Sequence, residues 1–250
     1  MAVSIKSARE IELMREAGKR LAHVHQELEA MIAPGISTWE IDAKGEKLIR
    51  DCGCIPNFLH YNGYPASICV SVNDEVVHGI PRKDRYLKEG DIVSLDAGLI
   101  YKGYHSDAAR THAVGKVSTE AQKLMDVTKQ SFFEGIKMAK EGQHLHDVSR
   151  AIEEYVTPYG YGIVRDLVGH GIGTALHEDP QIPNYAQKRR GVRLQAGMTL
   201  AIEPMINAGT WQVRFLRDGW TVVTKDGSLS AHYENTILVT DGEPEILTLY

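Results

Sequence analysis

Apolar and polar positions along this chain repeat with two periods, and together they predict helices and strands in two successive rounds. Two serine–glutamate capping boxes, Ser7-x-x-Glu10 and Ser37-x-x-Glu40, each precede apolar residues at helical spacing. The helical pattern after the first box extends to Ile32. Short runs rich in branched residues then predict strands at 67–72, 92–100 and 108–114, with a hairpin turn at 101–104.

The second round has the same order of elements. Thr119-x-x-Gln122 opens a predicted helix toward Met138, and a further helix is predicted over about 144–155. The stretch 180–193 is rich in proline, lysine and arginine and predicts an inter-strand loop. Strands are predicted around 198–206, 220–224 and 232–239. The mixture predicts an α+β fold with a substantial sheet covered by helices.

An internal repeat relates the two rounds at a constant spacing of 107 residues. Leu87 and Gly90 precede Asp96 as Leu194 and Gly197 precede Glu203. The same spacing joins four further pairs: Gly35 with Gly142, Ile41 with Val148, Ile49 with Val156, and Gly53 with Gly160. This register favours a duplicated helix-plus-strand unit over coincidence. We expect one domain, 1–250, whose halves of roughly 1–117 and 118–250 pack about a pseudo-twofold axis and bring Asp96 and Glu203 into one cleft.

Composition and charge exclude several classes of protein. With 43% hydrophobic and 24% charged residues in 250, the chain has ordinary globular usage. A net charge of −5 gives no basic footprint for DNA or other nucleic acid. No apolar run approaches the roughly 20 residues of a membrane span, and the segment from Met1 to Lys6 shows no secretory signal. Three cysteines, with Cys52 and Cys54 interpreted as packing residues, suit a reducing compartment. We expect a cytoplasmic protein, and a monomer.

Acidic residues interrupt strand patterns that are otherwise apolar: Asp96, Asp107, Glu203 and Glu234. Asp107 follows Asp96 across the predicted hairpin, so these two carboxylates can lie side by side. Like charges in that position need either a bound proton or a cation between them. His170, between Gly169 and Gly171, adds an imidazole where a ligand can approach closely, although a Gly-His-Gly segment is often only a turn.

These five side chains predict a metal site. Four carboxylates and one neutral imidazole carry four negative charges, which two divalent cations would balance. The donor set suits Mn²⁺, Fe²⁺, Co²⁺ or Zn²⁺. Two such ions about 3.5–4 Å apart lower the pKa of a water between them and polarise a carbonyl, so the implied reaction is metal-assisted hydrolysis.

At these residues the chain resembles a known family, type I methionine aminopeptidase in its short form without an N-terminal zinc-binding extension. The resemblance extends essentially end to end, through 73–81, the strand with Asp96, Ser106-Asp107, 169–173, His177-Glu178, 202–204, 218–220 and Tyr233-Glu234. It implies the pita-bread fold, in which duplicated helix-strand halves surround a curved antiparallel sheet. It also implies two metal ions held by Asp96, Asp107, His170, Glu203 and Glu234. In this resemblance Asp107 and Glu234 bridge the ions, and Glu203 also transfers the proton of the attacking water.

The resemblance further implies two catalytic histidines and a methionine pocket. His78 would lie near the scissile amide nitrogen and His177 near the carbonyl oxygen. Without the resemblance, His78 would be interpreted as an ordinary strand-end histidine, and His177 would stay undecided. The implied pocket wall consists of Phe58, Tyr61, Tyr64, Cys69, Leu176 and Trp220. Phe58 stands where the family often has cysteine and Leu176 where it often has an aromatic residue; core packing is the alternative interpretation.

Three hypotheses for function remain. The first is removal of the initiator methionine from nascent proteins whose second residue is small. The second is an X-Pro dipeptidase or creatinase-type hydrolase, which would usually carry a further N-terminal domain; we expect no room for one before Ser7. The third is a metal-free binding module, which would have lost ligands that are present here. Basic residues that could help docking near the ribosomal exit, but are more often merely solvated, are Lys188, Arg189, Arg190, Arg193, Arg214, Arg217 and Lys225.

Overall fold

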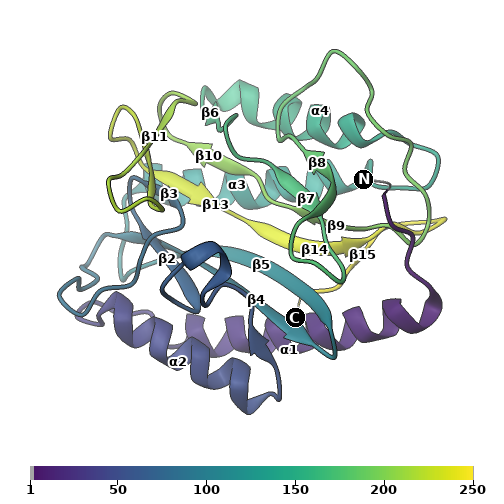
Figure 1. Ribbon diagram of the computed structural model, residues 1–250. Helices are drawn as coiled ribbons and strands as arrows, with labels where there is room; N and C mark the ends of the chain where they lie inside the picture. The colour runs from purple at the N-terminus through teal and green to yellow at the C-terminus, as the bar shows by residue number, and fades with distance from the viewer. Residues whose placement is uncertain (1–2, 250) are drawn as a thin grey trace.

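Two pairs of α-helices lie along a curved antiparallel sheet in the computed structural model, which describes residues 3–249 (Figure 1). Met1 and Ala2, the start of the segment in which no secretory signal was found, and Tyr250 lie outside the described residues. The helices of the described part are α1 (Ala8–Glu29), α2 (Thr38–Asp51), α3 (Thr119–Ile136) and α4 (Leu145–Val156), with the 3-10 helices η1 (Tyr61–Gly63) and η2 (Thr157–Tyr159).

The strands form one large sheet and two small ones, with antiparallel pairing. The large sheet has the order β1-β4-β5-β14-β9-β7-β8, with β2 paired to β4 and β15 to β14. Its strands are β1 (Ile55–Pro56), β2 (Ile68–Val72), β4 (Ile92–Tyr101), β5 (Tyr104–Ala113), β7 (Gly169–Gly171), β8 (Glu178–Ile182), β9 (Thr199–Ile202), β14 (Glu234–Leu238) and β15 (Glu245–Ile246). The small sheets, β13-β10-β6 and β11-β12-β3, consist of β3 (Glu75–Val77), β6 (Gly162–Ile163), β10 (Met205–Asn207), β11 (Val213–Phe215), β12 (Val222–Thr224) and β13 (Ser230–His232).

Both predicted capping boxes are present and begin α1 and α2. The Ser7 and Ser37 side chains accept hydrogen bonds from the backbone three residues later, and the glutamates at those positions accept from the serine backbone. Helix α1 ends at Glu29, short of Ile32. Helix α3 is capped one residue before the predicted box, because the Ser118 hydroxyl accepts from Ala121 N at 3.1 Å. Local hydrogen bonding therefore fixes where the helices begin.

Separate hydrophobic cores hold each helix pair against its part of the sheet. One core packs α1 and α2 against β2 and β4, with fully buried Leu21, Ile41 and Leu95. Another packs α3 and α4 against β9 and β14 through Phe132 and Ile152. Each such side chain contributes about 1.5–3 kcal/mol when fully buried. The mixture of helices and antiparallel sheet confirms the predicted α+β class.

The sequence repeat is also a repeat of backbone hydrogen bonds. Gly35 N donates to Leu87 O at 2.8 Å, and the equivalent Gly142 N donates to Leu194 O at 2.9 Å. Before β4 and before β9, Gly90 and Gly197 adopt φ of 90° and 92°, a conformation that favours glycine. Matching turns therefore direct two equivalent strands, β4 and β9, toward the same region of the sheet.

Strands predicted as continuous at 198–206 and 232–239 are each broken once, which corrects the prediction. β9 belongs to the large sheet and β10 to a small one, with Glu203 and Pro204 between them. Proline has no N–H to donate to a ladder. The partner strands break beside it at Tyr233, whose N–H donates to Pro204 O at 3.2 Å. The two neighbouring segments, β9–β10 and β13–β14, therefore cross between the large sheet and the small one at the same level.

The predicted loop at 180–193 was wrong at its start, because β8 contains Pro180 and extends to Ile182. β8 is the last strand in the order of the large sheet. An edge strand tolerates proline, since one row of its backbone groups has no ladder partner. The remainder of the stretch, from Pro183 onward, forms no strand or helix.

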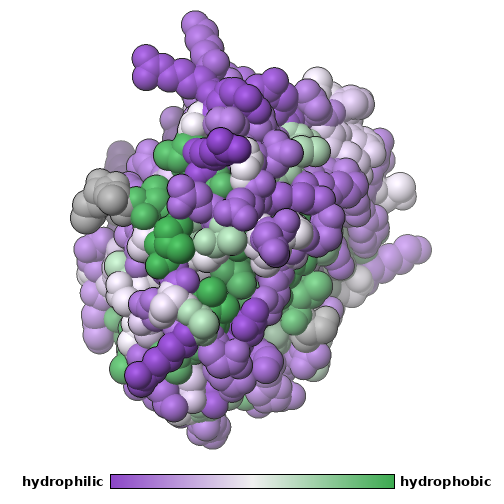
Figure 2. All heavy atoms as spheres, turned by 90° about the vertical axis from the view of Figure 1, so that its right-hand side faces the viewer, coloured by the Kyte–Doolittle hydropathy of each residue, from purple (hydrophilic) through white to green (hydrophobic). Residues whose placement is uncertain are grey.

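Figure 2 shows the face on the right-hand side of Figure 1, where hydrophilic residues dominate and apolar residues form small groups among them. Among residues 3–249, no helix combines the length and apolar character that crossing a bilayer requires.

Candidate metal centre

The β4–β5 hairpin carries the first two acidic side chains of the site. Its strands pair from Ile92 with Ala113 to Tyr101 with Tyr104, so the turn is the predicted one. Asp107 lies opposite Gly98, and Asp96 lies opposite Ala109. The two carboxylates are thus diagonal neighbours on one face of the hairpin and lie side by side, as predicted. Gly98 makes room for this arrangement, because a Cβ there would lie 3.0 Å from Asp107 Oδ1.

The breaks in the second half place the two glutamates. Ile202, the last residue of β9, pairs with Asn235 of β14. One residue further, Glu203 follows the end of β9 and Glu234 begins β14, so the two carboxylates lie beside each other where the strands leave the large sheet. Glu234 also pairs with Ala109 of β5. This pairing joins the glutamates to the hairpin that carries Asp96 and Asp107.

His170 lies on β7, which pairs with both β8 and β9; the Gly-His-Gly segment is a strand and not a turn. Its Nδ1 lies 2.9 Å from Gly171 O. Because a carbonyl oxygen only accepts, Nδ1 carries the hydrogen and Nε2 keeps a free electron pair. Nε2 lies 3.6 Å from Glu203 Oε1. The imidazole is therefore in the form that binds metal.

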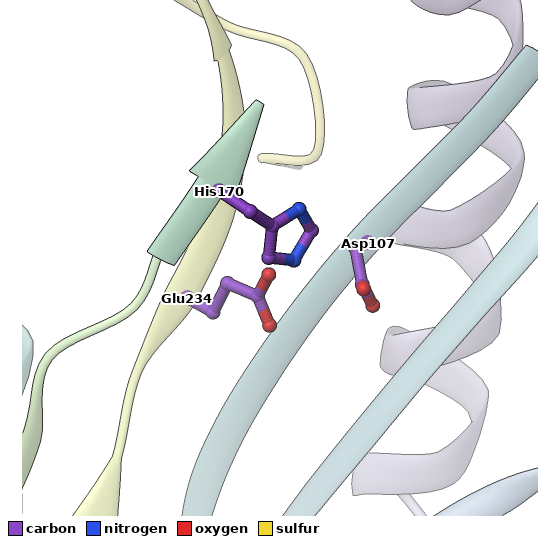
Figure 3. Close-up of side chains that lie close together, drawn as sticks. All are labelled: Asp107, His170 and Glu234. Atoms are coloured by element: carbon purple, nitrogen blue, oxygen red, sulfur yellow. The ribbon is translucent and has the colours of Figure 1, made fainter. Parts of the chain in front are cut away.

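Three of these donors converge closely. Ligand atoms of Asp107, His170 and Glu234 all lie within 4.8 Å of one another. Figure 3 shows the three side chains close together, carried by β5, β7 and β14. Asp96 and Glu203 line the same cavity, which has a volume of about 230 Å³. The structure thus brings all five predicted ligands to one place.

Desolvation raises the pKa of every carboxyl group in this cluster. It raises the pKa of Asp96 to about 7, where nearby His232 opposes the shift and Glu203 adds to it. It raises the pKa of Glu203 to about 8. The pKa values of Asp107 and Glu234 lie well above their usual range, because desolvation is reinforced by the neighbouring carboxylates. Without a cation, the four acids cannot all be ionised at neutral pH.

The unpaired oxygens of the cluster test whether a metal fits. Asp96 Oδ1 and Glu234 Oε1 are buried and have no hydrogen-bond partner among residues 3–249. Buried oxygens of this kind normally have a partner, and a divalent cation would supply one while neutralising the carboxylates. The oxygen donors and the free Nε2 suit first-row transition metals. The residues present therefore fit divalent metal ions.

The remaining lining of the cavity is largely apolar and aromatic. Buried members are Phe58, Tyr64, Cys69 and Leu176. Tyr64 and Trp220 meet edge to face with ring centroids 5.1 Å apart, and the Tyr64 hydroxyl donates to Gly79 O at 2.9 Å. Desolvation raises the pKa of the Cys69 thiol well above its usual value, so this sulfur is a neutral wall atom. The wall suits an apolar side chain.

Both predicted histidines outside the ligand set line this cavity. His78 has a left-handed backbone (φ 59°), and desolvation lowers its pKa to about 4. The His177 ring lies against that of His170, with centroids 4.3 Å apart. Desolvation also lowers the pKa of His177, although part of this residue reaches solvent. Both rings are therefore neutral at physiological pH.

Two residues near the cavity were not singled out from the sequence. Asn62, an exposed residue of η1, forms part of the wall. His232 lies 3.7 Å from Glu203 Oε2, and neither ring nitrogen has a hydrogen-bond partner among the described residues. It also borders a separate cavity of about 340 Å³. Only its position two residues before Glu234 could have indicated it.

Comparison with known proteins assigns the family. A family profile described as metallopeptidase family M24 matches residues 12–241, which is most of the chain. The chain belongs to metallopeptidase family M24. An M24 relative from Clostridium acetobutylicum, named methionine aminopeptidase, is 53% identical over 247 residues that cover 99% of each protein. Methionine aminopeptidase 1 of Bacillus subtilis is 51% identical, covering 97% of this chain and 98% of the relative.

Solved structures agree with the M24 assignment. The crystal structure of methionine aminopeptidase from Thermotoga maritima has a TM-score of 0.97 and 47% identity, with 100% of both chains covered. The pita-bread fold of M24 enzymes, which the resemblance implied, is therefore the fold of this chain. An Xaa-Pro dipeptidase from Bacillus anthracis has a TM-score of 0.76 and 26% identity, covering 98% of this chain but 61% of its own. That M24 relative has additional chain, as expected for its type.

Proposed function

We propose that this chain is a methionine aminopeptidase that removes the N-terminal methionine of nascent proteins when the second residue is small. The observation that carries the proposal is that one cavity has two kinds of lining. The five proposed metal ligands line it together with an apolar, aromatic cluster that contains Phe58, Tyr64 and Leu176. The volume of about 230 Å³ is below the 300–1,000 Å³ typical of pockets for drug-sized ligands, and suits a single residue.

The five ligands would hold two divalent ions, with Asp107 and Glu234 as bridges; Co²⁺, Mn²⁺, Fe²⁺ and Zn²⁺ are the candidates. When bound, such ions polarise the scissile carbonyl and acidify an attacking water. Asp107 and Glu234 lie close to His170 and also interact electrostatically with Asp96, which supports the bridging assignment. Glu203 would accept the proton of the attacking water and pass it on; it lines the cavity with its Oε1 3.6 Å from His170 Nε2.

The two neutral histidines would act on the substrate and not on the metal. His177 donates a hydrogen bond to the carbonyl oxygen as negative charge develops there. His78 lies near the scissile nitrogen, beside Trp220, with ring centroids 6.3 Å apart. Phe58, Tyr61, Tyr64, Cys69, Leu176 and Trp220 enclose the methionine side chain.

The substrate class also suggests where the enzyme works. New chains with a free N-terminal methionine arise at ribosomes, so we place the enzyme in the cytoplasm. Activity as a monomer is part of the same proposal. Docking at the ribosomal exit through the exposed basic residues is a further proposal.

Hydrolysis of Met-Ala-Ser by protein loaded with one metal at a time tests the function. Met-Ala-Ser should lose methionine, Met-Leu-Ser should react much more slowly because of its bulky second residue, and Ala-Pro peptides should stay intact. Acetylated Met-Ala-Ser is the matched control, because it lacks the free amino group. Preferential cleavage of Ala-Pro would assign the X-Pro hydrolase function instead. Absence of metal binding would leave only the binding-module hypothesis.

A further inference from the structure

The phenol of Tyr61 is joined to His177 by a direct hydrogen bond. The Tyr61 hydroxyl lies 2.8 Å from Nδ1 of His177, and their ring centroids are 5.5 Å apart. Tyr61 belongs to η1, whereas His177 lies in the segment between β7 and β8. On its other side, the His177 ring lies against His170. The imidazole is thus held between a phenol and a proposed metal ligand.

The backbone around Tyr61 is unusual and well supported. His60 and Asn62, the residues on either side, adopt φ of 66° and 49°, a left-handed conformation that is unfavourable for residues with a side chain. Backbone hydrogen bonds hold this turn, from His60 N to Tyr64 O at 2.8 Å and from Tyr61 N to Phe58 O at 2.9 Å. Strain of this kind persists where the surroundings fix it, and it is frequent at functional sites. Here it fixes the phenol beside His177.

The backbone that carries His177 is held independently of Tyr61. The next residue, Glu178, accepts from Lys6 Nζ at 2.6 Å and from the Ser4 hydroxyl at 2.7 Å. Its other oxygen accepts from Ala175 N at 3.2 Å. Lys6 is itself anchored, since its backbone N–H donates to Gly197 O at 2.8 Å. Loss of the Tyr61 hydroxyl would therefore free the His177 ring without releasing the segment.

A neutral imidazole has one nitrogen that donates and one that accepts, and the partner of one nitrogen decides the role of the other. We propose that Tyr61 is a positioning residue whose hydroxyl donates to Nδ1 of His177, so that Nε2 carries the hydrogen and can donate to the substrate carbonyl oxygen. With the opposite tautomer, Nε2 would only accept and could not bind that oxygen. This inference rests on the proposed function and adds to it a residue that sets the hydrogen-bonding role of His177.

Tyr61→Phe tests the proposal because it keeps the ring in the pocket wall and removes only the hydroxyl. We expect kcat for Met-Ala-Ser to fall about tenfold, as for loss of an outer partner of an active-site histidine. KM should stay within about twofold, and metal content and Tm should not change. Tyr104→Phe is the control, since the Tyr104 hydroxyl donates to the Glu10 side chain and Tyr104 is not part of the cavity lining; this variant should keep the full rate.

A double-mutant cycle separates action through His177 from a direct effect on the substrate. In the His177→Ala background, Tyr61→Phe should cause no further loss, because the phenol acts through the imidazole. The proposal would be overturned if the kcat loss of the double variant equalled the product of the two single losses. A full rate in Tyr61→Phe alone would also overturn it.

Nitrogen-15 spectra of the His177 ring, assigned with His177→Ala, supply a readout that needs no activity. They should show hydrogen on Nε2 in the wild type and a mixture of tautomers in Tyr61→Phe. Hydrogen on Nδ1 in the wild type would refute the inference. Inactivity of the wild type on Met-Ala-Ser would refute the proposed function and leave this spectral test in place.

Discussion

Metal affinity should rise steeply with pH, because protons and metal compete for the same carboxylates. In the metal-free protein the pKa of Asp96 is raised to about 7 and that of Glu203 to about 8. Below these values the folded site holds protons that a metal ion must displace; above them the oxygens are free. His170 does not oppose this trend, since its pKa is lowered to about 4 and its ring stays neutral.

The size of the effect follows from the ionised fractions. Between about pH 6 and about pH 8, the ionised fraction of Asp96 rises about tenfold and that of Glu203 about fiftyfold. If both groups must ionise, the apparent affinity rises by two orders of magnitude or more. In Glu203→Gln, affinity should be lower throughout and should depend less steeply on pH, because one titrating ligand is removed.

Calorimetric titration of Mn²⁺ into metal-free protein measures the apparent affinity of the wild type and of the variant at each pH. Repeating it in buffers with different ionisation enthalpies counts the protons released, which should exceed one per protein near pH 6 and decrease toward pH 8. The Glu203→Gln variant is the matched control. An affinity that does not change with pH, or binding without proton release, would show that these carboxylates are already ionised in the metal-free site.

Further substitutions distinguish the roles of the site residues. Asp107→Asn or Glu234→Ala should lose metal stoichiometry and turnover together while circular dichroism still shows a folded chain, and either variant with two bound metals and near-normal activity would refute the bridging assignment. Trp220→Ala should reduce discrimination between Met- and Leu-initiated peptides by about 1–3 kcal/mol, and unchanged relative rates would place this ring outside the pocket. His177→Ala should keep its metals and KM but lose about 10²–10³ in kcat, whereas His170→Ala should lose metal; elemental analysis and single-turnover rates of both variants would show whether this division holds.

Features that depend on local chemistry could be predicted from the sequence. Ser7 and Ser37 cap their helices with their own side chains, so the starts of α1 and α2 needed no tertiary information. Asp96 and Glu203 were identifiable because a carboxylate is unusual within an apolar strand pattern, and the repeat related them. The resemblance to a known family then contributed the pocket wall and the roles of the two outer histidines.

The predictions that were wrong or missing concern features that depend on partners distant in sequence. β7 is three residues long and two of them are glycine, so it is a strand only because β8 and β9 pair with it. The strand breaks at Pro204 and Tyr233 arise because two paired segments of the chain leave the large sheet together. Asn62 gave no signal, since a polar residue in a glycine-containing turn is ordinary. Its place in the wall results from the fold around it.

β5 and β14 meet through two registered residue pairs, and Asp107 and Glu234 lie at this junction. A bound ion would cross-link the two strands. Asp96 and Glu203 follow the repeat, but His170 does not, because Gly63 stands 107 residues before it. The centre is therefore not two copies of one half-site. Fragments separated between β5 and α3 would each carry an incomplete ligand set, so recovery of metal binding on mixing them would measure their reassembly.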